Sequence, residues 1–178
     1  HNESGMIAIR LPLPPGNLLT LWNNPKRFMD AYFARFKGYF NSGDAGYIDE
    51  DGYVFITGRI DDIINVAGHR LSTGEMEEVV ARHPAVAECA VFGVSDELKG
   101  EIPICVVVLK AHVDIETETL QAEIVQSVRK TIGPVASLKK VFVVKRLPKT
   151  RSSKILRKTM RKIADGKEYR VPSTIDDP

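Results

Sequence analysis

The residues best suited to chemistry lie in the run from Gly58 to Arg70, which holds two Arg, two Asp and two Gly. Arginine beside aspartate is a pairing that holds phosphates and ribose hydroxyls. Glycine adopts backbone angles closed to other residues, so it suits a chain that turns or passes close to a ligand. A solvated loop with a surface ion pair would have the same composition. Spacing alone favours that plainer interpretation.

A second candidate is Lys154, within a run from Lys149 to Lys162 in which every ionisable residue is basic. Such a run fits a solvated helix face, a phosphate or nucleic-acid patch, or a catalytic loop. It contains no aromatic residue to stack on a base, and the net charge of the chain is only +2, which argues against nucleic acid. In the catalytic interpretation Lys154 ends a polar loop and opens a helix. There its cation would lower the repulsion between a carboxylate and the α-phosphate of ATP.

The first run resembles the hinge motif of the acyl-adenylate-forming enzymes, which include acyl-CoA synthetases, luciferases and peptide-synthetase adenylation domains. Two other stretches match the same superfamily in the same order. Ser42–Asp44, followed by Asp51–Tyr53, resembles its ribose-binding segment. Residues 147–154 resemble its catalytic-lysine loop. The resemblance extends from about residue 7 to the C-terminal end and identifies the C-terminal portion of such an enzyme.

Residues 66–72 and 132–136 are similar to acetyl- and propionyl-CoA synthetases in particular. The resemblance implies an AMP-forming acid–thiol ligase whose substrates are a short-chain carboxylate, ATP and coenzyme A, with AMP and pyrophosphate released. It also implies Mg²⁺ with the ATP, held by a large N-terminal domain that this chain lacks. We therefore expect the chain to be inactive alone. Because the acyl pocket would lie in that domain, the sequence does not separate acetate from propionate.

The resemblance assigns a role to each matching residue, and these roles fall into four groups. They are catalysis by Lys154, nucleotide binding by Asp44, Arg59 and Arg70, coenzyme A binding by Gly68 and Arg129, and a hinge at Asp61. His69 has no partner at metal-ligand spacing, so we expect no metal site in this chain.

Ser153 departs from the family loop, which usually has glycine at this position. Serine is small and can cap a helix, so the loop is compatible with it. If the position requires a positive φ, however, serine is strained there. In related short-chain enzymes the matching lysine is acylated and deacylated, so the resemblance also implies an acetyltransferase and a deacetylase as partners acting on Lys154.

The composition is ordinary for a soluble globular protein, with 43% hydrophobic and 27% charged residues. No apolar run approaches membrane-spanning length and no signal-peptide pattern is present, so we expect a cytoplasmic protein with no membrane partner. Cys89 and Cys105 lie in separate apolar runs. They are expected to be buried free thiols in a reducing compartment.

Residues 1–60 contain signals for two or three strands and one helix, with Asn24 as a helix cap before Pro25. These elements are too few to bury their own apolar surface, so we interpret them as the mostly β tail of the large AMP-binding domain. Residues 61–178 predict a mobile C-terminal domain of the α+β class. In it helices pack against a three-stranded sheet formed by residues 87–94, 102–109 and 140–145.

A rival interpretation is a stand-alone module that binds an anion or a nucleic acid through the basic face of residues 149–162. A third is a carrier-protein or regulatory fold without catalysis. A glycine-rich phosphate loop upstream of His1 would decide for the enzyme.

Overall fold

The computed structural model describes residues 1–136 and 138–177. The chain divides into two compact units, one from His1 to Asp61 and the other from Asp62 onward. Each unit has its own sheet.

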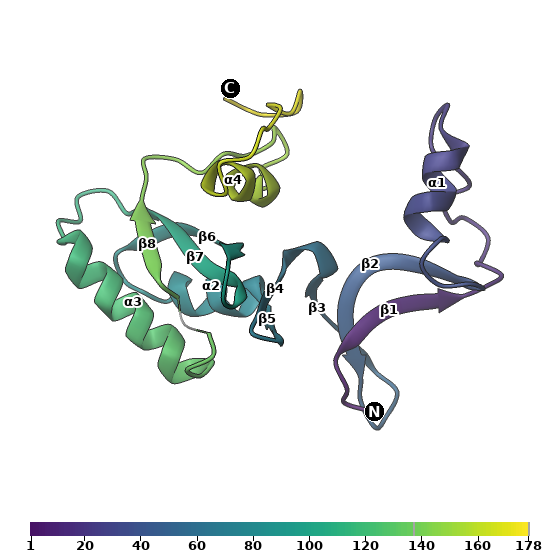
Figure 1. The fold of residues 1–178 in the computed structure, drawn as a ribbon, viewed down its shortest axis with the longest axis horizontal. Helices are drawn as coiled ribbons and strands as arrows, with labels where there is room; N and C mark the ends of the chain where they lie inside the picture. Colours follow the sequence, from purple (N-terminus) through teal and green to yellow (C-terminus); the bar gives the residue numbers. More distant parts are fainter. Residues whose placement is uncertain (137, 178) are drawn as a thin grey trace. The chain divides into compact units, whose positions relative to one another are not determined.

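The first unit is an antiparallel sheet in the order β1-β2-β3, accompanied by one helix (Figure 1). Its elements are β1 (Gly5–Arg10), α1 (Pro25–Tyr32), β2 (Tyr39–Ile48) and β3 (Val54–Arg59). Asn24 caps α1 as expected, because its side chain accepts a hydrogen bond from the Arg27 backbone N–H at 3.0 Å. The helix ends at Tyr32.

Strand β3 leaves much apolar surface uncovered in the first unit. The residues Val54, Phe55 and Ile56 are 55%, 44% and 58% exposed. Three consecutive exposed apolar residues on one strand are typical of a surface that another part of a protein covers.

The second unit contains a five-stranded sheet in the order β5-β4-β7-β6, with β8 pairing in parallel with β7 (Figure 1). It begins with the 3-10 turn η1 (Ile60–Asp62), which crosses the boundary between the units. The strands are β4 (Ile63–Val66), β5 (His69–Ser72), β6 (Val86–Asp96), β7 (Gly100–Leu109) and β8 (Lys140–Val143). The helices are α2 (Thr73–Ala81), α3 (Thr117–Thr131) and α4 (Arg157–Ala164).

Alternating side chains of β6 and β7 build a core on each face of this sheet. Val91 and Val107 belong to the larger core, which α2 and α3 complete with Met76, Val80, Leu120, Ile124 and Val128. Phe92 and Val106 belong to a smaller core, which Met160 of α4 and Leu147 complete. Because neighbouring strand residues point to opposite faces, α4 packs on the face opposite α2 and α3.

The α+β class expected from the sequence is confirmed, and the sheet contains two strands beyond the three expected. The extra strands β4 and β5 have four residues each, which is too short for a clear alternation of apolar and polar residues. One local prediction is wrong. Lys154 does not open a helix, because α4 begins three residues later at Arg157, with Leu156 at its N-cap position and no side-chain hydrogen bond to the cap.

Both cysteines are free thiols, as predicted, with Cys105 buried and Cys89 half-buried. Burial, together with the charge of Glu77, raises the pKa of Cys89 to about 11, and burial also raises the pKa of Cys105. At neutral pH both side chains are therefore protonated and behave as small apolar groups. None of the helices in the described part of the chain is long and apolar enough to span a membrane.

Candidate functional site

Asp44 and Arg59, predicted to bind the nucleotide together, face each other on paired strands β2 and β3. The Arg59 Nη1 atom donates hydrogen bonds to Asp44 Oδ1 at 2.9 Å and to the Ser42 carbonyl at 3.1 Å. Asp44 Oδ2 has no hydrogen bond to any residue within the described ranges. The pair therefore presents one fixed carboxylate with a free acceptor oxygen beside a guanidinium.

Gly43 allows this arrangement. Its φ is +79°, and a Cβ atom there would lie only 2.5 Å from Arg59 Nη2. Any other residue would be strained by the backbone angle and would displace the guanidinium. The glycine in the sequence Ser42-Gly43-Asp44 is thus required sterically by the nearby guanidinium of Arg59.

Asp61 and Asp62 are neighbours in sequence, but they are tied to different units. The Asp61 carboxylate lies 3.6 Å from Arg59 Nη2 of the first unit, and its side chain is 76% exposed. The Asp62 carboxylate lies 3.7 Å from Arg157 Nη1 of the second unit. The boundary between the two units falls between these residues, at the position assigned to the hinge.

Arg157 anchors the second unit next to that boundary. Its Nε and Nη2 atoms donate to the Glu77 carboxylate at 2.9 and 2.7 Å, while Glu77 Oε1 also accepts from the Val91 backbone N–H at 2.8 Å. Burial lowers the pKa of Arg157, but its hydrogen bonds and charge interaction with Glu77 outweigh this and raise it, so the guanidinium stays charged. This network joins α2, β6, α4 and the residue after the proposed hinge.

Gly68 and Arg70, predicted to contact coenzyme A and the nucleotide, belong to the β4–β5 hairpin. Val66 pairs with His69 across a two-residue loop in which Ala67 and Gly68 have φ of +48° and +87°. Two positive φ values are typical of the type I′ turns that match the twist of a hairpin. Apart from its two chain neighbours, a Cβ on Gly68 would meet no atom of the described residues within 4 Å, so the loop is open on that side. The Arg70 side chain is exposed and forms no ion pair with a described residue.

Arg129, the other residue predicted to contact coenzyme A, lies in the last turn of α3. Its side chain is exposed and forms no ion pair within the part of the chain that the structure covers. The geometry does not bring it together with Gly68 or Arg70 through any hydrogen bond or ion pair between described side chains.

Lys154 lies in a short hairpin rather than at a helix start. Lys149 and Ile155 form an antiparallel bridge, and the Thr150 N–H donates to the Lys154 carbonyl at 2.9 Å. The Lys154 N–H in turn donates to Thr150 Oγ1 at 3.1 Å. The side chain of Lys154 is exposed and has no acidic partner among the described residues. Residues 149–155, which we call the lysine loop, therefore present an unpaired ammonium group near the tip of a hairpin.

Ser153 has a φ of +63°, which is the condition under which serine is strained. The Ser153 N–H donates to the Thr150 carbonyl at 2.8 Å and closes the turn of the lysine loop. Glycine, which the family loop usually has at this position, would adopt the same angle without strain.

If Lys154 is the catalytic lysine that the resemblance implies, Ser153→Gly in the full-length protein should raise the rate of acyl-AMP formation about two- to fivefold, since relief of roughly 1 kcal/mol of strain favours the turn that presents Lys154. The thioester-forming step should not change. Carboxylate-dependent pyrophosphate release measures the first step, and conversion of supplied acyl-AMP measures the second. An unchanged or lower first rate would show that serine fits this backbone without cost.

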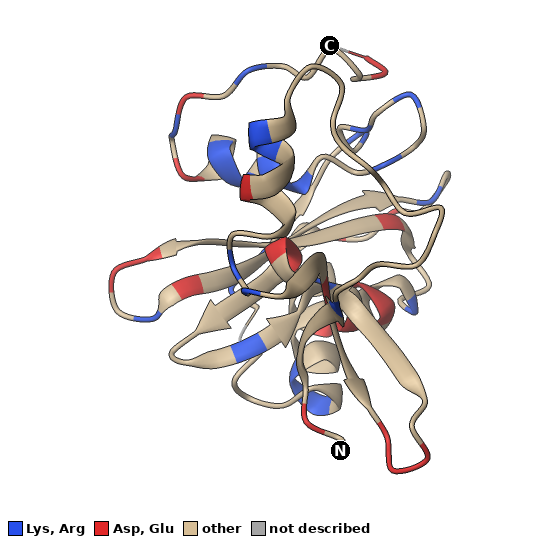
Figure 2. Cartoon of the chain, turned by 90° about the vertical axis from the view of Figure 1, so that its right-hand side faces the viewer, with Lys and Arg blue, Asp and Glu red and all other residues tan. Residues whose placement is uncertain are grey.

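The basic run from Lys149 to Lys162 is not a uniform solvated face. Lys149 pairs with Glu88 at 2.7 Å, Arg157 pairs with Glu77, and Arg161 pairs with Glu101. Figure 2 shows Lys and Arg on and around α4, with Asp and Glu on neighbouring elements. Four members form no ion pair with a described residue, namely Arg151, Lys154, Lys158 and Lys162. The three paired residues are neutralised within the second unit, which weakens the case for a nucleic-acid surface.

A metal site has no support in residues 1–136 and 138–177, where no three His, Cys, Asp or Glu side chains come together to hold an ion. The Mg²⁺ that the resemblance implies thus has no ligand set in this part of the protein.

Comparison with known proteins places these observations in a family. Residues 75–154 match the family described as AMP-binding enzyme C-terminal domain. The matched range starts in α2 and ends at the catalytic-lysine candidate. Residues 75–154 are therefore similar to the C-terminal domain of AMP-binding enzymes. The resemblance expected from the motifs is therefore confirmed.

Two relatives align with nearly the whole chain. An uncharacterised protein of Pseudomonas aeruginosa is 61% identical over 177 residues, which is 99% of this chain and 28% of that protein. Acyl-CoA synthetase short-chain family member B, a mitochondrial protein of Dictyostelium discoideum, is 53% identical over 176 residues, which is 99% of this chain and 26% of that protein. The chain thus spans about a quarter of the length of these relatives.

The fold of this AMP-binding C-terminal domain and the unit before it also occurs in a solved structure. ATP-bound MatB from Rhodopseudomonas palustris superposes with a TM-score of 0.76 at 28% sequence identity. The match covers 92% of this chain and 31% of that protein.

Several residues of the site could not be found from the sequence. Glu77 is one of three glutamates on α2, and Glu88 lies on β6. Nothing in their spacing marks them as the partners of Arg157 and Lys149. Asp62 lies inside the hinge motif, yet its pairing with a residue 95 positions later follows only from the tertiary fold.

Proposed function

We propose that this chain is the C-terminal part of an AMP-forming short-chain acyl-CoA synthetase acting on acetate or propionate. In the first step a carboxylate oxygen attacks the α-phosphorus of ATP, forming acyl-AMP and breaking the bond to pyrophosphate. In the second step the coenzyme A thiol, after losing its proton, attacks the acyl carbon. A thioester forms and AMP leaves with the electron pair.

The observation that carries this proposal is the unpaired cation of Lys154 on an ordered turn inside the AMP-binding C-terminal domain. Its neighbours Lys149 and Arg157 are held by acids, so Lys154 stays available for an external anion. An ammonium group between the carboxylate and the α-phosphate lowers their repulsion and stabilises charge in the transition state. We assign Lys154 as the catalytic residue of adenylation.

The nucleotide side of the site follows from the Asp44–Arg59 pair. Arg59 holds Asp44 through Oδ1 and leaves Oδ2 free to accept hydrogen bonds from the ribose hydroxyls. This arrangement supports the nucleotide-binding roles of both residues. Arg70 would supply a further positive charge to the nucleotide from the β4–β5 hairpin.

The second step would use the β4–β5 hairpin. The open space beside Gly68 suits close approach of pantetheine to the backbone, and Arg129 would attract a phosphate of coenzyme A. The lysine loop lies at the α4 side of the second unit, apart from the β4–β5 hairpin (Figure 1). Rotation about Asp61 would present first one and then the other to the reacting groups.

We further propose that residues 1–60 complete a large AMP-binding domain and that residues 61–178 form the mobile domain. The exposed apolar side chains of β3 support this division, because a missing part of the large domain would cover them. The same missing part would hold the acyl pocket, Mg²⁺ and most of the ATP contacts.

The exposure of Lys154 also supports its acetylation and deacetylation by partner enzymes as an on–off control. Acetylation would remove the charge on which the first step depends.

The test compares the 178-residue chain with the full-length enzyme. We expect the full-length enzyme to release pyrophosphate with acetate or propionate and ATP, and to form acyl-CoA when coenzyme A is added. The chain alone should release none above buffer. Release by the chain alone would refute catalytic incompleteness, and a full-length enzyme inactive on every short-chain acid would refute the proposed function.

A further inference from the structure

The segment Thr174–Asp177 runs beside the lysine loop and bonds to it through the backbone. The Arg151 N–H donates to the Thr174 carbonyl at 2.9 Å, and the Asp176 N–H donates to the Lys149 carbonyl at 2.9 Å. Thr150 and Ile175 form an antiparallel bridge between these two bonds. The segment therefore adds a single β-bridge, flanked by two backbone hydrogen bonds, to the hairpin that presents Lys154.

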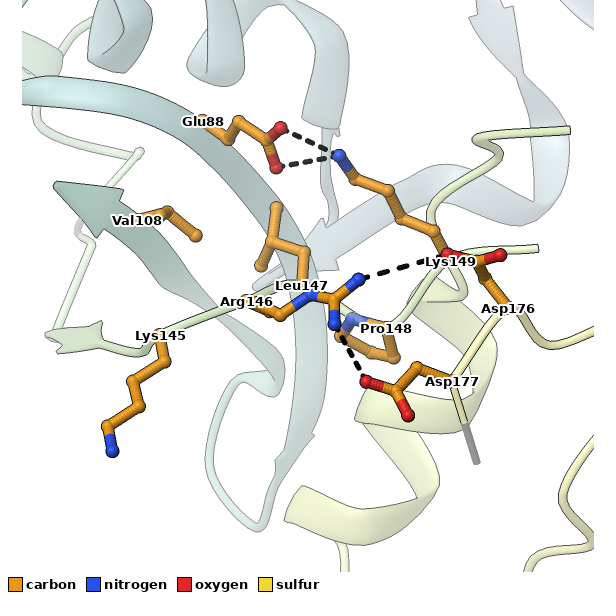
Figure 3. Close-up of a pocket in the computed structure, with 9 residues that line it drawn as sticks. All are labelled: Glu88, Val108, Lys145, Arg146, Leu147, Pro148, Lys149, Asp176 and Asp177. Carbon is orange, nitrogen blue, oxygen red and sulfur yellow. Dashed lines mark hydrogen bonds and ion pairs between the residues drawn. The ribbon is translucent and has the colours of Figure 1, made fainter. Parts of the chain in front are cut away.

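Ion pairs with Arg146 also hold the segment Thr174–Asp177 next to the lysine loop. Arg146 Nη1 lies 2.7 Å from the Asp177 carboxylate, and Arg146 Nη2 lies 3.8 Å from the Asp176 carboxylate. On the other side of the loop, Lys149 pairs with Glu88 of β6 at 2.7 Å. Figure 3 shows these groups around a cavity of about 430 Å³, with the Arg146 pairs and the Lys149 pair on separate sides of it.

This added pairing stabilises the loop, because a two-stranded hairpin alone is marginally stable in water. The positive φ of Ser153 also destabilises this hairpin, by a backbone strain of order 1–3 kcal/mol. Within the hairpin, this strain is opposed by the bridge between Lys149 and Ile155, by the turn bonds of Thr150, and by the hydrogen bond from the Leu156 N–H to the Pro148 carbonyl at 2.9 Å. The two backbone bonds to Thr174 and Asp176 are thus a substantial share of what keeps the loop ordered.

We propose that Thr174–Asp177 is a positioning strap for the lysine loop and that adenylation depends on it. The strap touches no reacting group; it acts by holding the turn that carries Lys154. The inference rests on the proposed role of Lys154 in the first step. Because the lysine loop is not used in thioester formation, loosening the strap should slow acyl-AMP formation and spare the second step.

Two variants of the full-length enzyme test the strap. Asp176→Pro removes the N–H that donates to Lys149, while its effect on the preceding Ile175 favours the extended backbone already present there. Asp176→Asn is the matched control, because it removes the same carboxylate and keeps the N–H. A chain that stops before Ser173 removes the whole strap and covers the case in which the proline variant folds poorly.

Hydrogen exchange of the backbone amides in residues 149–155 measures directly whether the strap stabilises the lysine loop. We expect exchange about fivefold or more faster in Asp176→Pro and in the shortened chain than in Asp176→Asn, as loss of a hydrogen bond predicts. Acyl-AMP formation should fall about five- to tenfold in the same two variants, with a lower kcat and little change in KM for ATP. Conversion of supplied acyl-AMP to acyl-CoA should match that of Asp176→Asn.

Unchanged exchange in both variants would overturn the strap as a support of the loop. Faster exchange with undiminished adenylation, or equal losses in the two steps, would overturn its positioning role. If the unaltered enzyme forms no acyl-AMP, the proposed function fails, while exchange still decides whether the segment holds the loop.

Discussion

Replacing Lys154 with glutamine in the full-length enzyme should lower acyl-AMP formation on the order of 100- to 1000-fold, the usual loss when one charge-stabilising group is removed from a transition state. Conversion of supplied acyl-AMP to acyl-CoA should stay within about twofold of the unaltered enzyme, since an interaction made only in the first transition state does not affect the second. The two half-reactions are measured separately, by pyrophosphate release and by thioester formation.

The chemical reason distinguishes three forms of the residue. Lys154→Gln and acetylated Lys154 both lack the charge and should share one phenotype. Lys154→Arg keeps the charge but should also fail in the first step, because a planar guanidinium does not replace a compact ammonium between two anions. A uniform loss over both steps in all three forms would indicate damage to the fold.

Lys158→Gln is a matched control for the charge change. Lys158 lies four residues away in α4, is exposed and, like Lys154, forms no ion pair with a described residue. Its loss should leave both half-reactions close to normal. Appreciable acyl-AMP formation by Lys154→Gln would remove Lys154 from the mechanism.

The parts of the fold that the sequence predicted are those with strong local patterns. Leu120, Ile124 and Val128 recur every four residues and form the buried face of α3. Ser72 accepts a hydrogen bond from the Glu75 N–H at 3.4 Å and caps α2, as is typical of a serine followed three residues later by glutamate. Such signals depend on neighbours within one or two turns, so a single sequence contains them.

The features that escaped prediction depend on residues far apart in the chain. Strands β4 and β5 are too short to show a period, and β4 joins the main sheet through pairing of Val66 with Gly100, far apart in the chain. The helix expected at Lys154 is displaced to Arg157, because bonds from Thr150 fold residues 150–154 into a turn first. The strap is polar and lacks periodicity, so its pairing with the lysine loop appears only in three dimensions.

The candidate site likewise contains residues that the motifs predicted and supporting residues that they did not. Motifs located the candidate residues, and the structure brings Asp44 and Arg59 together while leaving Lys154 and Arg70 without acidic partners in the described chain. What the motifs could not supply is the support of these groups. Gly43 makes room for Arg59, and Glu77 fixes Arg157 beside the unit boundary.

Asp61→Pro in the full-length enzyme should impair one half-reaction at least about tenfold more than the other. Proline holds φ near −65°, whereas a hinge must adopt different backbone angles in its two states. The fixed angle fits at most one of the orientations, so the enzyme should be trapped near the state that serves one step. Rates of acyl-AMP formation and of acyl-AMP conversion, measured on the same preparation, give the ratio directly.

The matched control is Asp61→Ala, which removes the carboxylate that lies 3.6 Å from Arg59 but leaves φ free. Because that side chain is 76% exposed, loss of its ion pair should cost little, at most about 1 kcal/mol. The alanine variant should therefore keep the ratio of the two half-reactions near normal, and the difference between the variants isolates the backbone angle. Equal losses in both steps for Asp61→Pro would argue against a hinge at this residue. In that case the change of orientation would have to occur elsewhere, since Asp62 is already tied through Arg157 to the body of the second unit.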